Sequence, residues 1–259
     1  MNVIRTLKEL HQFVIEKKQA GKEIGFVPTM GFLHEGHISL IHLSKKYADV
    51  TIASIYINPS QFNDLNDFNK YPKNEEGDLR LLRVNFCDAA FIPERAQIDS
   101  LQKVSIDLGG LDMIMEGICR PGHFQGVVEV VYRLFSVVMP DKAFFGEKDF
   151  QQLQIIKKMV ETLKLPVEII GAPILREFNG LAMSSRNSRL SKKARDNAGF
   201  IYEVLKSFVN TERQILEKRL FESGFTLEYL EKHDFGGQRR LFIAGVYDGV
   251  RLIDNIELN

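Results

Sequence analysis

The segment PTMGFLHEGH (28–37) carries two histidines, His34 and His37, three residues apart, and its glycines Gly31 and Gly36 allow a ligand to approach the backbone closely. If a helix begins near Gly36, His34 and His37 lie at its N-terminus, where free N–H groups and the helix dipole favour a phosphate. Two other interpretations stay open. One is zinc binding, although the spacing is one residue short of the i, i+4 pair of a zinc-binding HExxH helix. The other is that the histidines serve only as a structural cap of the helix. The segment is typical of a phosphate-binding turn.

A second polar segment, FGEKDFQQ (145–152), follows another strand-like run. Lys148 is well placed for an anion at a strand–helix turn, and Gln152 lies one turn inside the expected helix. Asp149 can cap that helix, accept a ribose hydroxyl or help to hold a metal. The GxxxxGK[ST] signature of a P-loop occurs nowhere in the sequence. The alternative is a solvated turn with a capping aspartate.

A third segment, GLAMSSRN (180–187), offers two hydroxyls and a guanidinium from Ser184, Ser185 and Arg186. It opens a cationic run just before and inside a helix expected over 191–209, with positive charges at Arg186, Arg189, Lys192, Lys193 and Arg195. Cations at a helix N-terminus oppose the dipole by roughly a few tenths of a kcal/mol each. A bound polyphosphate would turn this opposition into attraction. A solvated charged loop is the alternative.

Two further segments are suited to a small organic acid. YINPSQF (56–62) places Asn58 and Gln61 after a strand, and RPGHF (120–124) leads into a helix expected over 123–138. Arg120 can pair a carboxylate or phosphate through two hydrogen bonds. The amides of Gln61 and Gln152 are suited to hydroxyl and carbonyl groups. Taken alone, each of these residues is also typical of an ordinary loop.

Alternating strand and helix patterns must position these segments. Strands are expected at 24–29, 50–57, 88–92, 142–146 and 167–171, and helices between them, with a loop-rich stretch at 94–122. Repeated strand–helix units predict an α/β fold, a doubly wound parallel sheet of the Rossmann-like type. Ligands bind such sheets at the carboxyl ends of the strands, where the polar segments lie.

The pattern changes after Pro173, which predicts a smaller C-terminal α+β domain. The helix at 191–209 is followed by a second helix, with Thr211 and Gln214 as a capping box and its end at Gly224. Three strand-like runs then follow, and Asp248-Gly249 between the last two predicts a tight hairpin. The expected domains are residues 1–174, for ATP and a small substrate, and residues 175–259, as a lid.

Composition narrows the classes of function. The chain has 259 residues, and its 34 basic and 34 acidic residues give a formal net charge of zero, so a bulk basic surface for nucleic acid is not expected. The longest apolar runs are too short to span a membrane. Cys87 and Cys119 form no CxxC motif, so neither a disulfide framework nor a cysteine zinc site is expected. With no signal-peptide pattern in MNVIRTLKELHQF, a cytoplasmic location is expected.

These segments together resemble the pantoate–β-alanine ligase family, the pantothenate synthetases. The resemblance covers nearly the whole chain and rests on PTMGFLHEGH, INPSQF, YPK, LDMIMEGICRPGHF, FGEKDFQQL, GLAMSSRN and the terminal RLIDN. The first motif is similar to the HxGH signature of the wider nucleotidyltransferase group, and MSSR is similar to the KMSKS element of class I aminoacyl-tRNA synthetases. Phe150 stands where the family usually has Tyr, but no departure removes a proposed catalytic group.

The resemblance implies a ligase of pantothenate biosynthesis that joins D-pantoate to β-alanine with ATP and Mg²⁺, through an adenylate intermediate. It implies catalytic roles for His37 as proton donor and for His34, Lys148 and Arg186. It implies ATP binding by Met30, Gly31, His34, Gly36, His37, Gly146, Glu147, Lys148, Asp149, Leu175, Met183, Ser184, Ser185 and Arg186. Substrate contacts are expected from Asn58, Gln61, Arg120, His123 and Gln152, and no protein metal cage is expected.

The family implies a homodimer with small-molecule substrates and neither a nucleic-acid nor a membrane partner. Three rival functions remain. A nucleotidyltransferase acting on a phosphate would not need INPSQF, RPGHF and the paired glutamines. A class I synthetase fragment would need a tRNA surface, which the neutral charge disfavours. A nucleotide-binding regulator would not need every polar group of the three phosphate motifs.

Overall fold

The computed structural model describes residues 1–62, 68–69 and 71–258 and divides into two compact units. Residues 1–147 and 151–172 form the first unit, and residues 148–150 and 173–259 form the second. Among the described residues, no helix combines the length and apolar character needed to cross a membrane.

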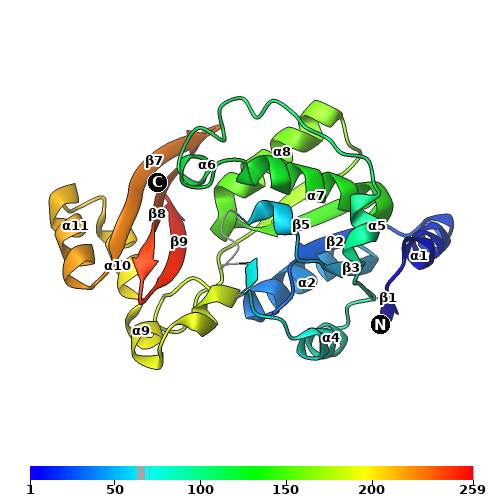
Figure 1. Cartoon of the computed structure of the whole chain (residues 1–259), viewed down its shortest axis with the longest axis horizontal. Helices are drawn as coiled ribbons and strands as arrows, with labels where there is room; N and C mark the ends of the chain where they lie inside the picture. Colours follow the sequence, from blue (N-terminus) through cyan, green and yellow to red (C-terminus); the bar gives the residue numbers. More distant parts are fainter. Residues whose placement is uncertain (63–67, 70, 259) are drawn as a thin grey trace. The chain divides into compact units, whose positions relative to one another are not determined.

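The first unit is built on a six-stranded, fully parallel sheet (Figure 1). Its strand order is β1-β4-β3-β2-β5-β6. The bounds are β1 Asn2–Ile4, β2 Ile24–Thr29, β3 Val50–Ile55, β4 Ala89–Phe91, β5 Lys142–Gly146 and β6 Glu168–Ala172. The predicted doubly wound parallel sheet is therefore confirmed. Strand β1 was not predicted, because three residues at a sheet edge carry no readable periodicity.

Helices cover both faces of this sheet because neighbouring strand residues point in opposite directions. Phe26 of β2 contacts Phe135 of α7, with ring centroids 6.2 Å apart, whereas Val27 lies in the cluster that includes Leu40 and Ile41 of α2. Figure 1 shows α7 and α2 on opposite sides of the strands. The bounds are α1 Leu7–Gln19, α2 Glu35–Tyr47, α4 Glu75–Val84, α5 Arg95–Asp99, α6 Glu116–Cys119, α7 His123–Val138 and α8 Phe150–Leu163, with short turns η1 Pro59–Gln61 and η2 Glu147–Asp149.

The helix α2 lies unusually close to the sheet. A Cβ at Gly25 would come within 2.3 Å of the Ser44 hydroxyl and 2.9 Å of the Ala48 Cβ. That hydroxyl in turn bonds Thr51 of β3 at 2.8 Å. Only glycine leaves room for this approach. Gly25 therefore allows α2, the helix that carries the two histidines, to pack closely against strand β2.

The second unit combines three antiparallel strands, in the order β7-β8-β9, with short helices. Asp248 and Gly249 both have positive φ, 51° and 71°, which confirms the tight hairpin between β8 and β9. The unit has its own core, which includes Leu205, Leu216 and Leu241. The bounds are η3 Ser185–Arg189, α9 Lys192–Asn197, α10 Phe200–Ser207, α11 Arg213–Glu222, β7 Thr226–Phe235, β8 Gln238–Tyr247 and β9 Val250–Glu257.

The prediction of one continuous helix over 191–209 is wrong. The helix breaks between α9 and α10, where a Cβ at Gly199 would lie 2.0 Å from the Asn179 carbonyl oxygen. The Asn179 side-chain amide donates to the carbonyls of Arg195 and Asp196, at 2.7 and 3.0 Å. This side chain satisfies the last carbonyls of α9 and so ends the helix.

One other local prediction is corrected in this unit. The N-cap of α11 is Glu212 and makes no side-chain cap bond, so the Thr211/Gln214 capping box does not form. The strand β7 continues to Phe235, and β8 starts at Gln238, because Gly236 and Gly237 make a further turn with φ of 65° and 92°. The residues at these strand ends are mostly polar, with Lys232, His233 and Asp234 before the turn and Gln238 and Arg239 after it.

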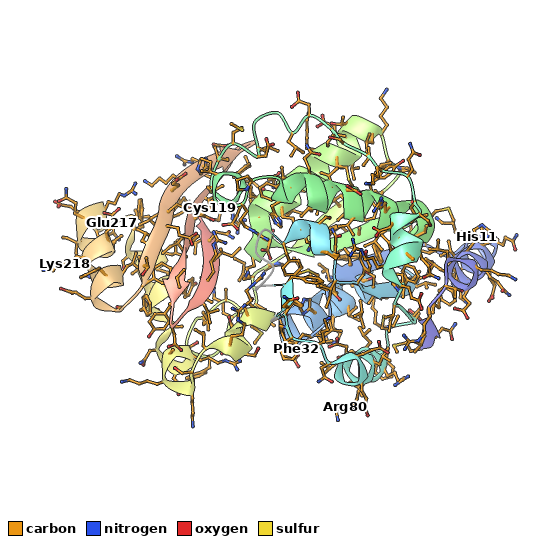
Figure 2. All side chains as sticks on the ribbon, in the orientation of Figure 1. His11, Phe32, Arg80, Cys119, Glu217 and Lys218 are labelled. Carbon is orange, nitrogen blue, oxygen red and sulfur yellow. The ribbon has the colours of Figure 1, made fainter. Side chains whose placement is uncertain are left out.

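The two thiols are expected to react very differently. Burial raises the pKa of Cys87 to about 12, whereas Cys119, labelled in Figure 2, is exposed. Because the thiolate is the nucleophile, Ellman's reagent at pH 8 should modify one thiol of the native chain quickly and both thiols of the denatured chain. Rapid modification of both thiols in native protein would contradict the burial of Cys87. The raised pKa also makes the free energy of unfolding depend on pH. The contribution of Cys87 to stability is lost as pH rises above about 8.5, the pKa of a thiol in the unfolded chain, toward the pKa in the folded chain.

Candidate active site

The two histidines cap the helix α2 at its N-terminus. His34 is the N-cap, and its Nδ1 accepts from the Gly36 N–H at 3.1 Å. His37 lies three residues on, and its Nδ1 accepts from the His34 N–H at 3.3 Å, which completes a capping box built from two imidazoles. The rings lie 4.1 Å apart. Because each Nδ1 is an acceptor, the proton of each neutral ring is on Nε2.

The loop before this helix is held by a buried carboxylate that the sequence analysis missed. Both Gly31 and Phe32 have positive φ, 78° and 50°. Asp78 of α4 accepts from the Phe32 and Leu33 N–H groups at 2.8 and 2.7 Å, and a Cβ at Gly31 would lie 2.9 Å from its Oδ2. Phe32 is labelled in Figure 2. Burial raises the pKa of Asp78, and the two backbone hydrogen bonds oppose this rise.

Replacing Asp78 by asparagine is expected to lower the free energy of unfolding by about 1–3 kcal/mol, because one buried N–H loses its acceptor. Chemical denaturation measures the loss. The matched control is Asp88→Asn, since Asp88 accepts from the Thr51 N–H through a single oxygen, and an amide oxygen can keep that bond.

The difference in the free energy of unfolding between wild type and Asp78→Asn should also increase toward acid pH. The raised pKa means that the folded chain holds the Asp78 proton more tightly than the unfolded chain, so the wild type gains stability as pH falls through that pKa. Equal stability of Asp78→Asn and wild type at every pH would contradict the role given to this carboxylate.

The turn after β3 brings Gln61 next to the histidine loop. Asn58 caps η1, and its amide also donates to the Gly126 carbonyl of α7 at 3.3 Å. A Cβ at Gly126 would lie 2.7 Å from the Ser60 carbonyl oxygen, so α7 and this turn pack closely. The Gln61 amide nitrogen lies 2.9 Å from the Met30 sulfur. Asn58, Gln61 and Met30 are therefore brought together within the first unit.

Arg120 and His123 both contact the main chain of Gln61. The Arg120 guanidinium and the His123 Nδ1 donate to the Gln61 carbonyl oxygen at 3.0 and 2.9 Å. His123 therefore carries its proton on Nδ1, unlike His34 and His37. Arg120 also lies 3.6 Å from the Glu116 carboxylate. These two side chains fix the turn that carries Gln61, and their predicted substrate contacts stay predictions.

The polar segment after β5 is divided between the two units. Gly146, Glu147 and Gln152 belong to the first unit, and Lys148 and Asp149 to the second. Beside Gln152, the buried Gln151 donates to the Leu111 and Ile114 carbonyls at 2.7 and 2.9 Å. Gln151 also accepts from the Glu116 N–H at 3.1 Å, so it anchors the 111–116 loop to α8. Gln151 was not predicted from the sequence, because no local motif marks it.

In the second unit, the Lys148 ammonium lies 3.8 Å from the Asp149 carboxylate, and its side chain is largely covered. Ser184 caps η3, accepting from the Arg186 N–H at 3.3 Å, and Ser185 is buried. Met183 donates its N–H to the Leu175 carbonyl at 3.0 Å. The unit thus carries its predicted site residues on two short segments.

The cationic run of residues 186–195 is partly neutralised by an ion pair that was not predicted from the sequence. Arg195 makes two hydrogen bonds to the Glu177 carboxylate, at 2.8 and 3.0 Å, which raises the pKa of Arg195. One of the five cations is therefore neutralised within the unit. Ser191 caps α9 and accepts from the Ala194 N–H at 3.3 Å.

The described residues offer a metal ion no ready protein cage. In the part of the chain that the structure describes, no three His, Cys, Asp or Glu side chains are grouped so as to hold one. Among these residues, a Mg²⁺ ion would therefore have at most two such side chains as ligands in any one place.

Known proteins match this chain over nearly its whole length. The profile of the family described as pantoate-beta-alanine ligase matches residues 2–257. A pantothenate synthetase of Christiangramia forsetii is 46% identical, with 100% of each chain covered, and one of Bacteroides thetaiotaomicron is 42% identical, with 99% of each chain covered.

Solved structures agree with this match. Pantothenate synthetase of Thermus thermophilus superposes with a TM-score of 0.90 at 36% identity, covering 99% of each chain. The pantoate-beta-alanine ligase of Francisella tularensis, complexed with beta-gamma ATP and beta-alanine, gives 0.90 at 37% identity, covering 99% of this chain and 97% of its own. The resemblance drawn from the motifs is confirmed: the chain belongs to the pantoate–β-alanine ligase family.

Proposed function

We propose that this enzyme condenses D-pantoate with β-alanine, using ATP and releasing AMP and pyrophosphate, through a pantoyl adenylate. The observation that carries the proposal is the paired-histidine N-terminus of α2, in a chain that matches the ligase family over residues 2–257. The Nδ1 atoms of His34 and His37 accept the capping bonds, so each ring would donate to a phosphate through its Nε2–H.

The first step forms the adenylate. A carboxylate oxygen of pantoate attacks the α-phosphorus of ATP, the bond to the bridging oxygen breaks, and pyrophosphate leaves with the electron pair. Negative charge grows on that oxygen, and donors already in place stabilise it. We assign this task to His34, Lys148 and Arg186, with His37 as proton donor.

The remaining ATP contacts follow from the same motifs. Backbone groups at helix and turn N-termini, together with hydroxyls, are suited to phosphate and ribose oxygens. We assign these contacts to Met30, Gly31, Gly36, Gly146, Glu147, Asp149, Leu175, Met183, Ser184 and Ser185.

The second step forms the amide. The neutral amine of β-alanine attacks the acyl carbon, the bond from that carbon to the AMP oxygen breaks, and the nitrogen loses a proton. We assign Gln61 and Gln152 to the pantoyl hydroxyls and carbonyl, with Asn58, Arg120 and His123 around Gln61. The contacts of Asn58, Arg120 and His123 with the Gln61 turn support this grouping.

Mg²⁺ is proposed to arrive with ATP. Because the described side chains form no cage for it, its ligands would be phosphate oxygens and water, as is usual for Mg²⁺–nucleotide complexes. We further propose that the enzyme is a cytoplasmic homodimer, and that residues 175–259 act as its lid. Sedimentation at several protein concentrations tests the dimer.

The test of the activity is ATP–pyrophosphate exchange with Mg²⁺ and without β-alanine, in the presence or absence of D-pantoate. Exchange that requires pantoate supports adenylate formation and identifies the acid. If exchange is absent, the full mixture is assayed, since β-alanine can be needed before pyrophosphate leaves. Folded protein that binds ATP but gives neither AMP nor pantothenate would overturn the proposal in favour of a nucleotide-binding regulator.

A further inference from the structure

The terminal RLIDN segment (251–255) has no task in the proposed reaction, yet its last two residues are almost completely buried. Asp254 is 4% exposed and Asn255 is 1% exposed, both in β9 of the second unit. Polar side chains buried to this degree need partners, because each unmet hydrogen bond costs free energy. Their partners show what the segment holds.

The Asn255 side chain links a guanidinium to the main chain of Lys148. Its Oδ1 accepts from the Arg240 Nε at 2.8 Å, and its Nδ2 donates to the Lys148 carbonyl oxygen at 3.0 Å. A guanidinium only donates and a carbonyl only accepts, so the amide has one satisfactory orientation. Asn255 therefore fixes the peptide that follows Lys148.

The same arginine fixes the chain two residues further on. The Arg240 guanidinium lies over the Phe150 ring, 4.2 Å from its centroid, and Phe150 also contacts Phe235 and Phe242. Lys148–Phe150 is thus held at its first residue by an amide and at its last by a stacked cation. Its backbone has little freedom to carry the lysine elsewhere.

Asn255 is itself anchored by a buried ion pair. Asp254 accepts from both terminal nitrogens of Arg176, at 2.6 and 2.9 Å, and from the Asn255 N–H at 2.7 Å. Arg176 lies over the Tyr202 ring, 3.8 Å from its centroid. Burial raises the pKa of Asp254, while Arg176 and the nearby charge of Lys148 oppose the rise.

We propose that Asn255, oriented by Arg240 and Asp254, is a positioning residue that holds Lys148 where its ammonium meets the triphosphate of ATP. The inference rests on the proposed function, which assigns Lys148 to the negative charge that grows on the bridging phosphate oxygen of ATP. It gives the RLIDN segment a task in the reaction although no side chain of the segment is assigned to substrate.

The test is a double-mutant cycle between Asn255→Ala and Lys148→Met, measured by pantothenate formation. Asn255→Ala alone is expected to lower kcat about tenfold to a hundredfold, because a small displacement of a catalytic group is costly. It should leave the KM for pantoate unchanged. In the Lys148→Met background the same change should have little further effect, since the group it positions is gone.

The controls separate positioning from folding. Arg251→Met lies in the same strand and removes an exposed ion pair to Glu228, so it should keep wild-type turnover. Thermal unfolding shows whether each variant folds. If Asn255→Ala does not fold, Arg240→Lys replaces it in the cycle, because it keeps the charge but loses the planar stacking on Phe150.

Each outcome has a defined meaning. A much smaller effect of Asn255→Ala in the Lys148→Met background supports positioning through Lys148. The same fold-loss in both backgrounds overturns the inference and leaves the proposed function standing. Normal turnover by a folded Asn255→Ala, or by Arg240→Lys where that variant takes its place, overturns it as well. Normal turnover by Lys148→Met removes the proposed role of Lys148, and the inference fails with it.

Discussion

Replacing His37 by glutamine is expected to lower the rate of adenylate formation about 10²- to 10⁴-fold, the usual contribution of a positioned acid or base. The fold should be unaffected. Glutamine is a favoured residue at the third position of a capping box, where its oxygen accepts from the N-cap N–H. It can therefore take over the bond that the His37 Nδ1 accepts from the His34 N–H. It cannot take over proton donation by Nε2.

The comparison with His37→Ala separates the two tasks of this ring. Alanine at this position removes the capping bond and the proton donor together. The His37→Ala variant should therefore unfold at a lower temperature than His37→Gln and be similarly inactive in ATP–pyrophosphate exchange. His42→Gln, on the same helix, is the matched control, since the His42 ring bonds the Asn85 side chain and has no part in the cap. A stable His37→Gln enzyme with near-normal exchange would show that His37 is a cap and not a proton donor.

Local pattern predicts this fold well where a segment is long and its surroundings are uniform. The bounds of β2, α7 and β5 match the expected ranges because buried apolar residues fill them and clear turn signals end them. The predictions fail where a residue far away in the sequence determines where a helix or strand ends. Asn179 ends α9 through contacts with Arg195 and Asp196, and periodicity within 191–209 carries no trace of that side chain.

The candidate site divides in the same way. His34 and His37 could be placed at a helix N-terminus from sequence, because capping and phosphate binding have local signatures. Asp78 and Asn255 could not, since each acts on a segment 45 or more residues away in the chain. The one local signal was polarity: Asp78 lies next to Leu79 among the buried residues of α4, and Asn255 lies next to Ile256 near the end of β9.

Replacing Lys148 by methionine is expected to lower turnover about 10²- to 10³-fold, the usual cost of losing one donor to developing negative charge. Methionine keeps the aliphatic stem and removes only the charge. The folded chain should tolerate this well, because the ion pair that the ammonium makes with Asp149 is a loose one of 3.8 Å. The bond that Asn255 donates to residue 148 is to the backbone and survives the change. Initial rates of AMP release at saturating ATP measure the effect.

The control for this change is Lys142→Met, at the start of the strand that leads to Lys148. Lys142 pairs with Glu23 at 2.7 Å, which raises the pKa of Lys142, so its loss removes a stronger ion pair than the loss of Lys148 does. If stability alone governed turnover, Lys142→Met would be the more damaged enzyme. We expect the reverse order. Equal turnover by the two variants would mean that the Lys148 ammonium does not act on the reacting phosphate.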